Sequence, residues 1–567
     1  MKTFFRITGI MWADFFAYYV LWMMIIYLTD IWKLDFTHAA AIINIWKGSA
    51  LVLPLVFVYL ADAFFGNFCI LLLTSLSYTV GLGLLWMSTP PVLGKSQGNC
   101  TAYKPECIGE QQKQLFYAAL VLIAVGIAGH LTSLGPFVGD QSEKFNNEFM
   151  ATVNRADQGG SVCSTMCRFM LGPCMGVLIP IIGFMVVTFV KSWGVQFGVS
   201  AIFALASLVV LLSGIRSYKY VGPRGSALTI VFRVFFAAFS KVLSRHPQDT
   251  NELYEKHDVH GNDTALLPHT DGLRCLDKAA IVLPQPTLEQ QEQHKWKLCR
   301  VTEVEATKIT IRIIPLWMTF IICGVVSAIG DTYFLEQATT LNPKLGRIKV
   351  PLIFFLGFYD QSKSLFSKLF VMVGTKIIRH STSCRRYVPP IGVAVAMVFS
   401  ILCCVAASKI ETRRLRIVKS HGLIDKPDDR VPMTIFWLLP QFALLGALDG
   451  IREWSVPYLV SDQAPPSMIT YFNYLQLGVF GVGFMGSALS VYVVGKISQK
   501  IGGINWFQST LNKSRLDNYY WVLAALSAVN LVIYIIVAYF YRYNDSVLEE
   551  LEEPEYDETE DNMFNHL

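Results

Sequence analysis

Apolar runs of about 20 residues recur along the chain and are separated by polar segments. A helix that crosses the hydrocarbon core of a bilayer needs about 20 consecutive apolar residues, so each run predicts one membrane-spanning helix. The eighth run is the weakest, because Asp360, Lys363 and Lys368 interrupt it. The pattern predicts an all-α membrane protein with twelve transmembrane helices, near residues 7–29, 44–63, 69–88, 115–135, 168–190, 196–214, 310–329, 350–374, 387–408, 433–457, 469–495 and 521–541.

The spacing of these runs divides the chain into two halves. A polar segment of about 95 residues separates the sixth run from the seventh, and the last residues of the chain are strongly acidic without Lys or Arg. The fourth and tenth runs end in the similar stretches GPFVGDQ and VPYLVSDQ, as two related bundles would. We predict an N-terminal six-helix bundle over 1–216, a cytoplasmic linker over 217–309, a C-terminal six-helix bundle over 310–543 and an acidic, disordered cytoplasmic tail over 544–567.

The amino-acid composition is typical of a protein embedded in a lipid bilayer. Of the 567 residues, 53% are hydrophobic and only 16% are charged, whereas soluble domains carry about 25% charged residues. The net charge of +5 is spread over loops, which does not indicate a nucleic-acid partner. The start of the chain runs directly into the first span without a small-residue cleavage site, so that span is expected to act as its own insertion signal.

The distribution of basic residues predicts the orientation. Lys2, Arg6 and the basic central linker belong in the cytoplasm under the positive-inside rule. One segment conflicts with this assignment, because KIETRRLRIVK follows the ninth span and should lie outside, yet is strongly basic. We retain twelve spans because the first loops usually dominate the orientation.

Cysteine spacing does not resemble a metal site, and no metal is predicted. Cys163 and Cys167 lie at the start of one apolar helix and Cys403 and Cys404 lie inside another, where packing is the usual role of cysteine. Cys100 and Cys107 differ, because they bracket a short polar loop. If this loop faces an oxidising compartment, a disulfide between them is expected, and Asn99 in NCT is a glycosylation acceptor on the same loop.

Three ionisable residues stand out among those inside the predicted spans. A charge at the centre of a helix costs about 2.5–3.5 kcal/mol on insertion scales, so each needs a partner, a watery cavity or a function. At 1.5 Å per residue, Asp14, His130 and Asp449 lie at similar depths from the cytoplasmic face, which predicts one shared polar cavity. The structural alternatives are a polar patch for Asp14, a bond from His130 to a carbonyl, and pairing of Asp449 with Arg452. Lys47, near the outer end of the second span, is interpreted as snorkelling.

Several motifs resemble one family. The stretches LADAFFGNF (60–68), SYKYVGPRGSALT (217–229), LRCLDKAA (273–280), WKLCRVTEVE (296–305), PLW (315–317) and SDQAP (461–465) resemble those of the plant nitrate/peptide transporter family, within the proton-dependent oligopeptide branch of the major facilitator superfamily. The resemblance covers nearly the whole chain. It implies an alternating-access transporter with twelve helices, usually a proton symporter, for nitrate, short peptides, hormones or specialised metabolites.

The chain departs from this family at charged positions. Where the family has a Glu-x-x-Glu-Arg pattern, this chain has Met11, Asp14 and Phe15, so only the second acid is kept. The resemblance places His130 at the expected lysine of the fourth span and Asp449 at the expected glutamate of the tenth. A histidine, with a pKa of about 6.5, exchanges protons near neutral pH more readily than a lysine. Ser327 replaces a histidine associated with nitrate in some members, which makes nitrate by that route less favoured.

The resulting expectation is a secondary transporter of a small solute, with Asp14 and His130 as the proton-linked pair. Asp449, Ser327 and Tyr18 are the predicted substrate-binding residues. The alternative is a sensor or scaffold that keeps the fold but transports weakly. No nucleophile–base arrangement indicates an enzyme, and no cofactor is expected beyond co-transported protons. The expected partners are a small molecule and the bilayer, in the plasma or vacuolar membrane, with no nucleic acid; the oligomeric state is left open.

Overall fold

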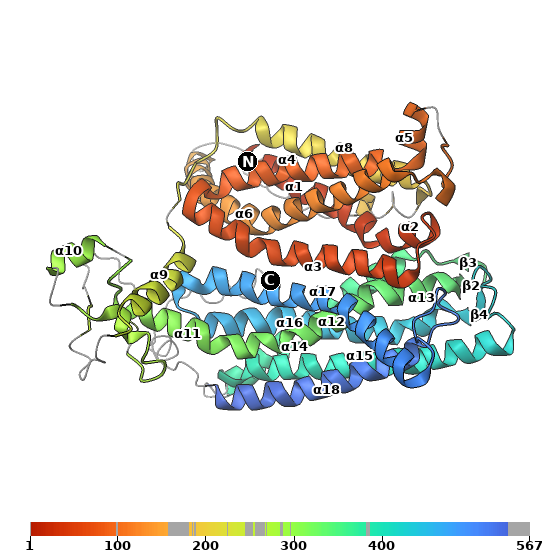
Figure 1. Cartoon of the computed structure of the whole chain (residues 1–567). Helices are drawn as coiled ribbons and strands as arrows, with labels where there is room; N and C mark the ends of the chain where they lie inside the picture. Colours follow the sequence, from red (N-terminus) through yellow and green to blue (C-terminus); the bar gives the residue numbers. More distant parts are fainter. Residues whose placement is uncertain are drawn as a thin grey trace.

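The computed structural model is almost entirely helical, and its helices form two layers (Figure 1). It describes residues 2–97, 100–156, 181–183, 185, 189–223, 225–243, 253–255, 267, 269–283, 287–294, 296–380 and 386–541. The N-terminal layer contains α1 (Lys2–Trp22), α2 (Met24–Asp30), α3 (Phe36–Leu60), α4 (Gly66–Met87), α5 (Pro90–Gln97), α6 (Glu110–Ala156) and α8 (Trp193–Leu212). The C-terminal layer contains α11 (Val301–Met318), α12 (Phe320–Ile329), α13 (Leu335–Thr340), α14 (Ile353–His380), α15 (Val388–Ser420), α16 (Leu439–Gln463), α17 (Ile469–Gly502) and α18 (Leu516–Phe540).

Each predicted span except the fifth coincides with a helix in the described part of the chain. Eight helical stretches there are long and apolar enough to cross a membrane, or nine when the bent pair α11–α12 is included. One of the eight, Phe36–Met87, joins α3 to α4 through the π-turn η1 (Ala61–Phe65), and Figure 1 shows that the chain reverses there. Gly66 makes this reversal with φ +74°, a conformation that side chains with a Cβ rarely adopt. The fifth predicted span lies mainly on residues outside the described part.

The seventh span begins earlier and ends later than its predicted range of 310–329. α11 starts at Val301, meets α12 at a bend of 41°, and continues through η5 (Gly330–Phe334) to α13. The first turns of α11 pack on the linker rather than on the other spans, because Val304 belongs to a small core with Val234 of α9. The apolar count missed these turns because Glu303, Glu305 and Lys308 interrupt them.

The predicted linker contains a small packed unit at one end of the molecule (Figure 1). Its elements are α9 (Ala227–Ser240), the short turn η4 (Asp277–Ala280) and α10 (Leu288–Gln293). Apolar residues of α9, of η4 and its preceding residue, of the segment before α11 and of the start of α11 form one small core; they are Val234, Ala237, Ala238, Leu276, Ala279, Ala280, Cys299 and Val304. We call this side of the molecule the linker end. The acidic tail lies outside the described residues.

The opposite end, here called the outer end, carries the strands and remaining short turns. β1 (Leu341–Asn342) pairs in parallel with β4 (Val431–Thr434), and β2 (Lys344–Leu345) pairs antiparallel with β3 (Ile348–Lys349). The short turns are η2 (Pro105–Cys107) and η7 (Ile435–Leu438) at this end and η8 (Pro466–Met468) at the linker end.

The basic segment after the ninth span is the end of α15 and not a loop. α15 has 33 residues, so it is about 50 Å long and extends beyond a hydrocarbon core of about 30 Å. Arg414 within this extension is buried and forms a bidentate pair with Glu411, at 2.7 and 2.8 Å. Part of the conflicting positive charge is therefore neutralised inside the protein.

The two halves meet along α3 and α17, which lie side by side (Figure 1). Glycines permit the close approach: a Cβ placed on Gly48 would lie 2.6 Å from the carbonyl oxygen of Gly481. No side chain fits into such a gap without moving one helix. This seam positions the polar residues that face each other between the halves.

Candidate functional site

Asp14 and His130 meet inside the N-terminal half. The Nδ1 atom of His130, on α6, lies 2.9 and 3.1 Å from the carboxylate oxygens of Asp14 on α1. The Nε2 atom lies 3.0 Å from the hydroxyl oxygen of Ser75 on α4. The side chain of His130 is 4% exposed and that of Asp14 is 33% exposed, so the acid is the solvent-accessible end of this chain of contacts.

The arrangement suits reversible protonation. In neutral His130, an Nδ1–H group donates to the carboxylate and Nε2 accepts a hydrogen bond from Ser75. When Nε2 gains a proton it becomes a donor, and the Ser75 hydroxyl can rotate to accept from it, so both protonation states are satisfied. The structural alternative for His130, a bond to a neighbouring carbonyl, is wrong.

Asp449 lies in the C-terminal half, buried on α16. Its two carboxylate oxygens each accept a hydrogen bond of 2.9 Å, one from Ser327 on α12 and one from Tyr359 on α14. Arg452 is farther away, with Nε 3.6 Å from the carboxylate. Pairing with Arg452 is therefore present but loose, and the closest partners come from other helices. Ser327 is itself buried, with its hydroxyl donated to Asp449.

The three charges do not form one cluster. His130 and Asp14 contact residues of α1, α4 and α6, whereas the hydrogen bonds and ion pairs of Asp449 in the described chain all come from the C-terminal half. Similar depth along the membrane normal placed them in one layer, but depth does not specify which face of a helix a side chain occupies. Two polar sites, one in each half, replace the single predicted cavity.

Lys47 joins the two halves. Its Nζ atom lies 2.9 Å from a carboxylate oxygen of Asp331, and the two side chains are only 18% and 20% exposed. One turn before it, the amide of Asn44 donates to Ser487 at 2.9 Å. The interpretation of Lys47 as a snorkelling residue is wrong, because its ammonium is held by a carboxylate of the other half and not by the membrane surface. The sequence signal for this pair was a base inside the second apolar run and an acid two residues beyond the seventh.

Further ionisable residues surround this pair. Lys363 on α14 binds Glu453 on α16 at 2.7 Å, and the guanidinium of Arg452 lies 3.8 Å from the ring centre of Phe480. Tyr18 of α1 faces them: it is 43% exposed and within electrostatic reach of Asp331, Asp360 and Glu453. We call this set the interface cluster; it comprises Tyr18, Tyr19, Lys47, Asp331, Tyr359, Asp360, Lys363, Asp449, Arg452 and Glu453.

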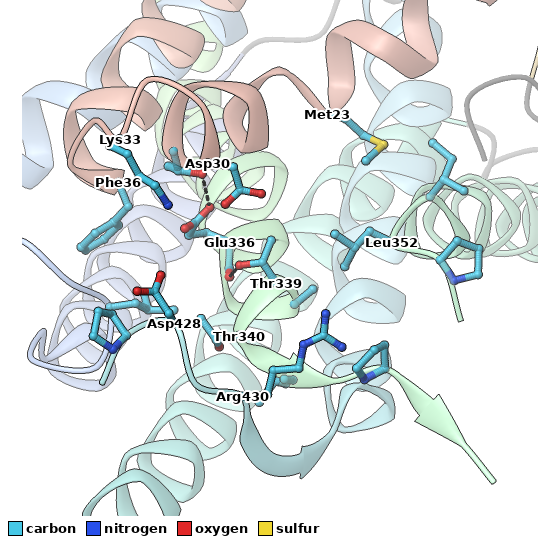
Figure 2. A pocket seen from close by; sticks show the side chains of 18 of the residues that line it. Met23, Asp30, Lys33, Phe36, Glu336, Thr339, Thr340, Leu352, Asp428 and Arg430 are labelled. Atoms are coloured by element: carbon cyan, nitrogen blue, oxygen red, sulfur yellow. Dashed lines mark hydrogen bonds between the residues drawn. The ribbon is translucent and has the colours of Figure 1, made fainter. Parts of the chain in front are cut away.

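A cavity of about 1020 Å³ opens between the halves at the outer end (Figure 2). Asp30 and Lys33 line it from the N-terminal half, and Glu336 and Arg430 line it from the C-terminal half. Figure 2 shows Asp30 beside Glu336 and marks the hydrogen bond of 3.3 Å from Thr29 to Glu336. This contact joins the two halves through residues that line the cavity.

The halves are also joined at the linker end. Tyr471, at the start of α17, donates a hydrogen bond of 2.6 Å to Asp62 in the turn between α3 and α4. The hydroxyl of Ser226, in the linker, lies 2.7 Å from the same Tyr471 oxygen. Asp62 belongs to the LADAFFGNF motif. This motif therefore lies at a contact between the two halves, and the sequence alone did not identify Tyr471 as its partner. Polar contacts therefore connect the halves at both ends of the interface.

Cys100 and Cys107 form a disulfide in the loop before α6, with Cα atoms 5.2 Å apart. Asn99 lies outside the described residues. In the linker, His269, Asp277 and Glu305 are close enough together to resemble a metal site. The ammonium of Lys308 lies 2.6 Å from Asp277 and 2.7 Å from Glu305, so it already forms ion pairs with both acids. This group holds the linker against α11.

Comparison with known proteins agrees with this architecture. Residues 68–512 match the POT family. The protein NRT1/PTR family 5.5 of Arabidopsis thaliana is 39% identical over 531 residues, which cover 94% of this chain and 95% of that relative. The protein NRT1/PTR family 5.6 of the same plant is 29% identical, covering 91% of this chain and 86% of its own length.

Solved structures show the same fold. An auto-inhibited POT family peptide transporter superposes with a TM-score of 0.62 at 17% identity, covering 96% of this chain and 98% of that one. The POT family transporter PepTSo gives a TM-score of 0.59, also at 17% identity, covering 95% and 98% of the two chains. At this identity the likeness extends to the twelve-helix arrangement of two bundles and not to the individual site residues.

Proposed function

The chain belongs to the POT family, and we propose from this membership that it moves a small solute across its membrane by alternating access, driven by protons. In this proposal Asp14 and His130 form the proton-linked pair, and the interface cluster holds the solute. The single observation that supports the coupling most directly is the contact of His130 with both Asp14 and Ser75.

The mechanism follows from where the pair lies. Asp14 is part of α1, and Tyr18, one helical turn further along the same face, reaches the interface cluster. Protonation of the pair changes the net charge of Asp14 and His130. This changes the electrostatic interaction between α1 and the charged residues of the C-terminal half. A proton and a solute that both bias the same rigid helix are thereby coupled, although they occupy different sites.

Alternating access needs contacts that open in turn at the two ends. At the outer end, Lys47 binds Asp331 and Thr29 binds Glu336; at the linker end, Tyr471 binds Asp62. All of these are polar contacts between rigid helices, which can separate and be hydrated without exposing an apolar core. α3 and α17 pack side by side along the interface, so the seam between them is the axis about which the halves would tilt.

The test is solute flux in proteoliposomes, with and without an imposed pH gradient. His130→Gln keeps a polar side chain but cannot be protonated, so gradient-driven uptake should be lost while exchange of solute at equal pH remains. Asp14→Asn should behave alike, and the double variant should be no worse than either single one, because the residues act as one unit. His421→Gln, which changes an exposed histidine after α15, is the matched control and should keep the gradient dependence. Gradient-driven uptake by His130→Gln would remove His130 from the coupling mechanism.

The second candidate is a sensor or scaffold with weak transport. Its supporting observation is the loss of two charged positions, since Met11 and Phe15 stand at exposed positions of α1 beside the single acid. Solute binding without measurable flux in the same vesicles would favour it. We further propose that the protein needs no cofactor besides protons, that it has no enzymatic activity, and that it resides in the plasma or vacuolar membrane.

A further inference from the structure

We propose that α15 binds an anionic phospholipid in the leaflet at the outer end of the molecule, with the lipid phosphate held by Lys409, Arg413 and Arg416. We call these three residues the basic strip. They belong to the basic segment after the ninth predicted span, whose charge at the outer end conflicts with the positive-inside rule. The pairing of Arg414 with Glu411 accounts for one positive charge of that segment, whereas the basic strip stays exposed.

The basic strip begins where the apolar part of α15 ends. No charged residue lies between Val388 and Ser408, and this length of helix measures about 30 Å, which matches the thickness of a hydrocarbon core. Lys409 follows directly and therefore lies at the level of the lipid headgroups. Arg413 and Arg416 lie about 6 and 10 Å farther out along the helix axis. Figure 1 shows α15 continuing to the outer end beside α18.

The basic strip continues a lipid-facing stripe of the same helix. Val398 and Leu402 are 41% and 45% exposed within the apolar part of α15, so these side chains face the acyl chains of the bilayer. Lys409 follows Leu402 by two helical turns and Arg413 follows by three, which places them on the same face. A phospholipid with its acyl chains along Val398 and Leu402 therefore has its headgroup at the basic strip.

Two tryptophan rings hold the cations of the basic strip in place. The Nζ atom of Lys409 lies 5.6 Å from the ring centre of Trp521 on α18, and the guanidinium carbon of Arg413 lies 3.6 Å from that of Trp437 in η7. Tryptophan is enriched at the boundary between a membrane and water. Stacking occupies the face of a guanidinium and leaves the N–H groups at its edge available to phosphate oxygens. The site is thus preorganised for an oxyanion.

The charge of the basic strip has no counter-ion within the protein. In the described part of the chain, none of its three side chains forms an ion pair or a hydrogen bond. The acids nearest in sequence have other partners, because Glu411 pairs with Arg414 and Asp425 pairs with Lys513 at 2.8 Å. Exposed basic groups at a membrane surface attract lipids with a net negative charge. The adjoining lipid-facing stripe favours such a lipid over a soluble anion.

The experiment measures lipid binding to the full-length protein in detergent by native mass spectrometry. Dioleoyl phosphatidylglycerol is the anionic probe and dioleoyl phosphatidylcholine the zwitterionic one, and wild type should bind the first more tightly. Lys409→Gln/Arg413→Gln should weaken phosphatidylglycerol binding about 25-fold, because each basic group near an anionic lipid contributes about fivefold, and should leave phosphatidylcholine binding unchanged. Lys95→Gln/Lys104→Gln removes two exposed charges from the outer end of the other half; it is the matched control and should bind like wild type.

A second measurement locates the lipid. Phosphatidylglycerol with a photoactivatable diazirine in its acyl chain is added to phosphatidylcholine nanodiscs, and adducts should map to α15 near Leu402 and disappear in the double variant of the basic strip. Arg416→Gln provides a test that does not disturb either tryptophan contact. It should weaken phosphatidylglycerol binding about fivefold, and it decides the matter alone if the double variant does not fold.

Equal phosphatidylglycerol binding by wild type and by the variants of the basic strip would overturn the inference. Equal affinity of wild type for the two lipids would also overturn it, and would leave the basic strip to a soluble or protein partner. Competition by glycerol 3-phosphate, without adducts near Leu402, would identify a site for a soluble anion and refute a lipid site. A loss in the control variant as large as in the double variant would show that net charge acts and not this site.

Discussion

Breaking the ion pair between Lys47 and Asp331 should open the outer end of the molecule. The pair joins α3 of one half to η5 of the other, with Nζ 2.9 Å from the carboxylate oxygen. Two unit charges at this distance attract by about 6 kcal/mol at an effective dielectric constant of about 20. Desolvation and ordering offset much of this, so we expect a net coupling of about 1.5–3 kcal/mol. The population of the outer-open state should then rise about 10–100-fold in Lys47→Met or Asp331→Asn.

The assay is the rate at which a buried cysteine at the outer end reacts with a membrane-impermeant maleimide. Ala338→Cys is suitable, because Ala338 is 1% exposed and borders the outer cavity. Cys275, an exposed free cysteine, is changed to Ser in the background. Each single variant of the ion pair should speed labelling about tenfold or more, and the double variant should add little, since one interaction is removed once.

A charge exchange provides the control. Lys47→Asp combined with Asp331→Lys restores an attractive pair across the same interface, so labelling should return toward the wild-type rate. Wild-type labelling in both single variants would show that the pair does not hold the halves together. Fast labelling in the exchanged variant would show that the substitutions act through packing and not through charge.

Two further predictions follow from buried groups. Burial lowers the pKa of Lys241 from its usual 10.5 to about 8, so between these pH values the unfolded chain binds more protons than the folded protein, and the free energy of unfolding should rise with pH. Lys241→Met should flatten the pH dependence of thermal stability measured in detergent. An unchanged slope would contradict this cause. Gly48→Leu should lower the yield of folded protein, because a Cβ there lies 2.6 Å from a backbone carbonyl of α17. Gly83→Leu, where nothing lies within 4 Å of the added atom, is its control, and equal yields for the two variants would show that the seam can widen.

The candidate site was only partly predictable. Asp14 and His130 could be picked out because a charge in an apolar run is costly and needs a partner, and that argument holds before any fold is known. In the sequence, Lys363 only weakens the eighth apolar run, whereas in the structure it binds Glu453 of α16. This pairing depends on which side chains α16 turns toward α14, and no local pattern contains that information.

The boundaries of the elements show the same division. Apolar length alone located every span that the structure describes, because the thickness of the bilayer sets the same length for all of them. It placed the start of α11 too late and took the end of α15 for a loop, because charged residues in both are covered by other parts of the protein. Hydropathy treats a charge as solvent-exposed, whereas Arg414 is buried against Glu411.

Apolar length, spacing and composition identify this chain as a helical membrane protein of two halves with ionisable residues inside its spans. These properties follow from composition, length and the high cost of an unpartnered charge in lipid, all of which are local. The pairings emerge only from the packed helices: His130 lies against Asp14 and Ser75, and Asp449 lies against Ser327 and Tyr359. The physical reason is that a helix presents side chains in all directions at a given depth, so the partner of each charge is decided by the rotation and packing of neighbouring helices.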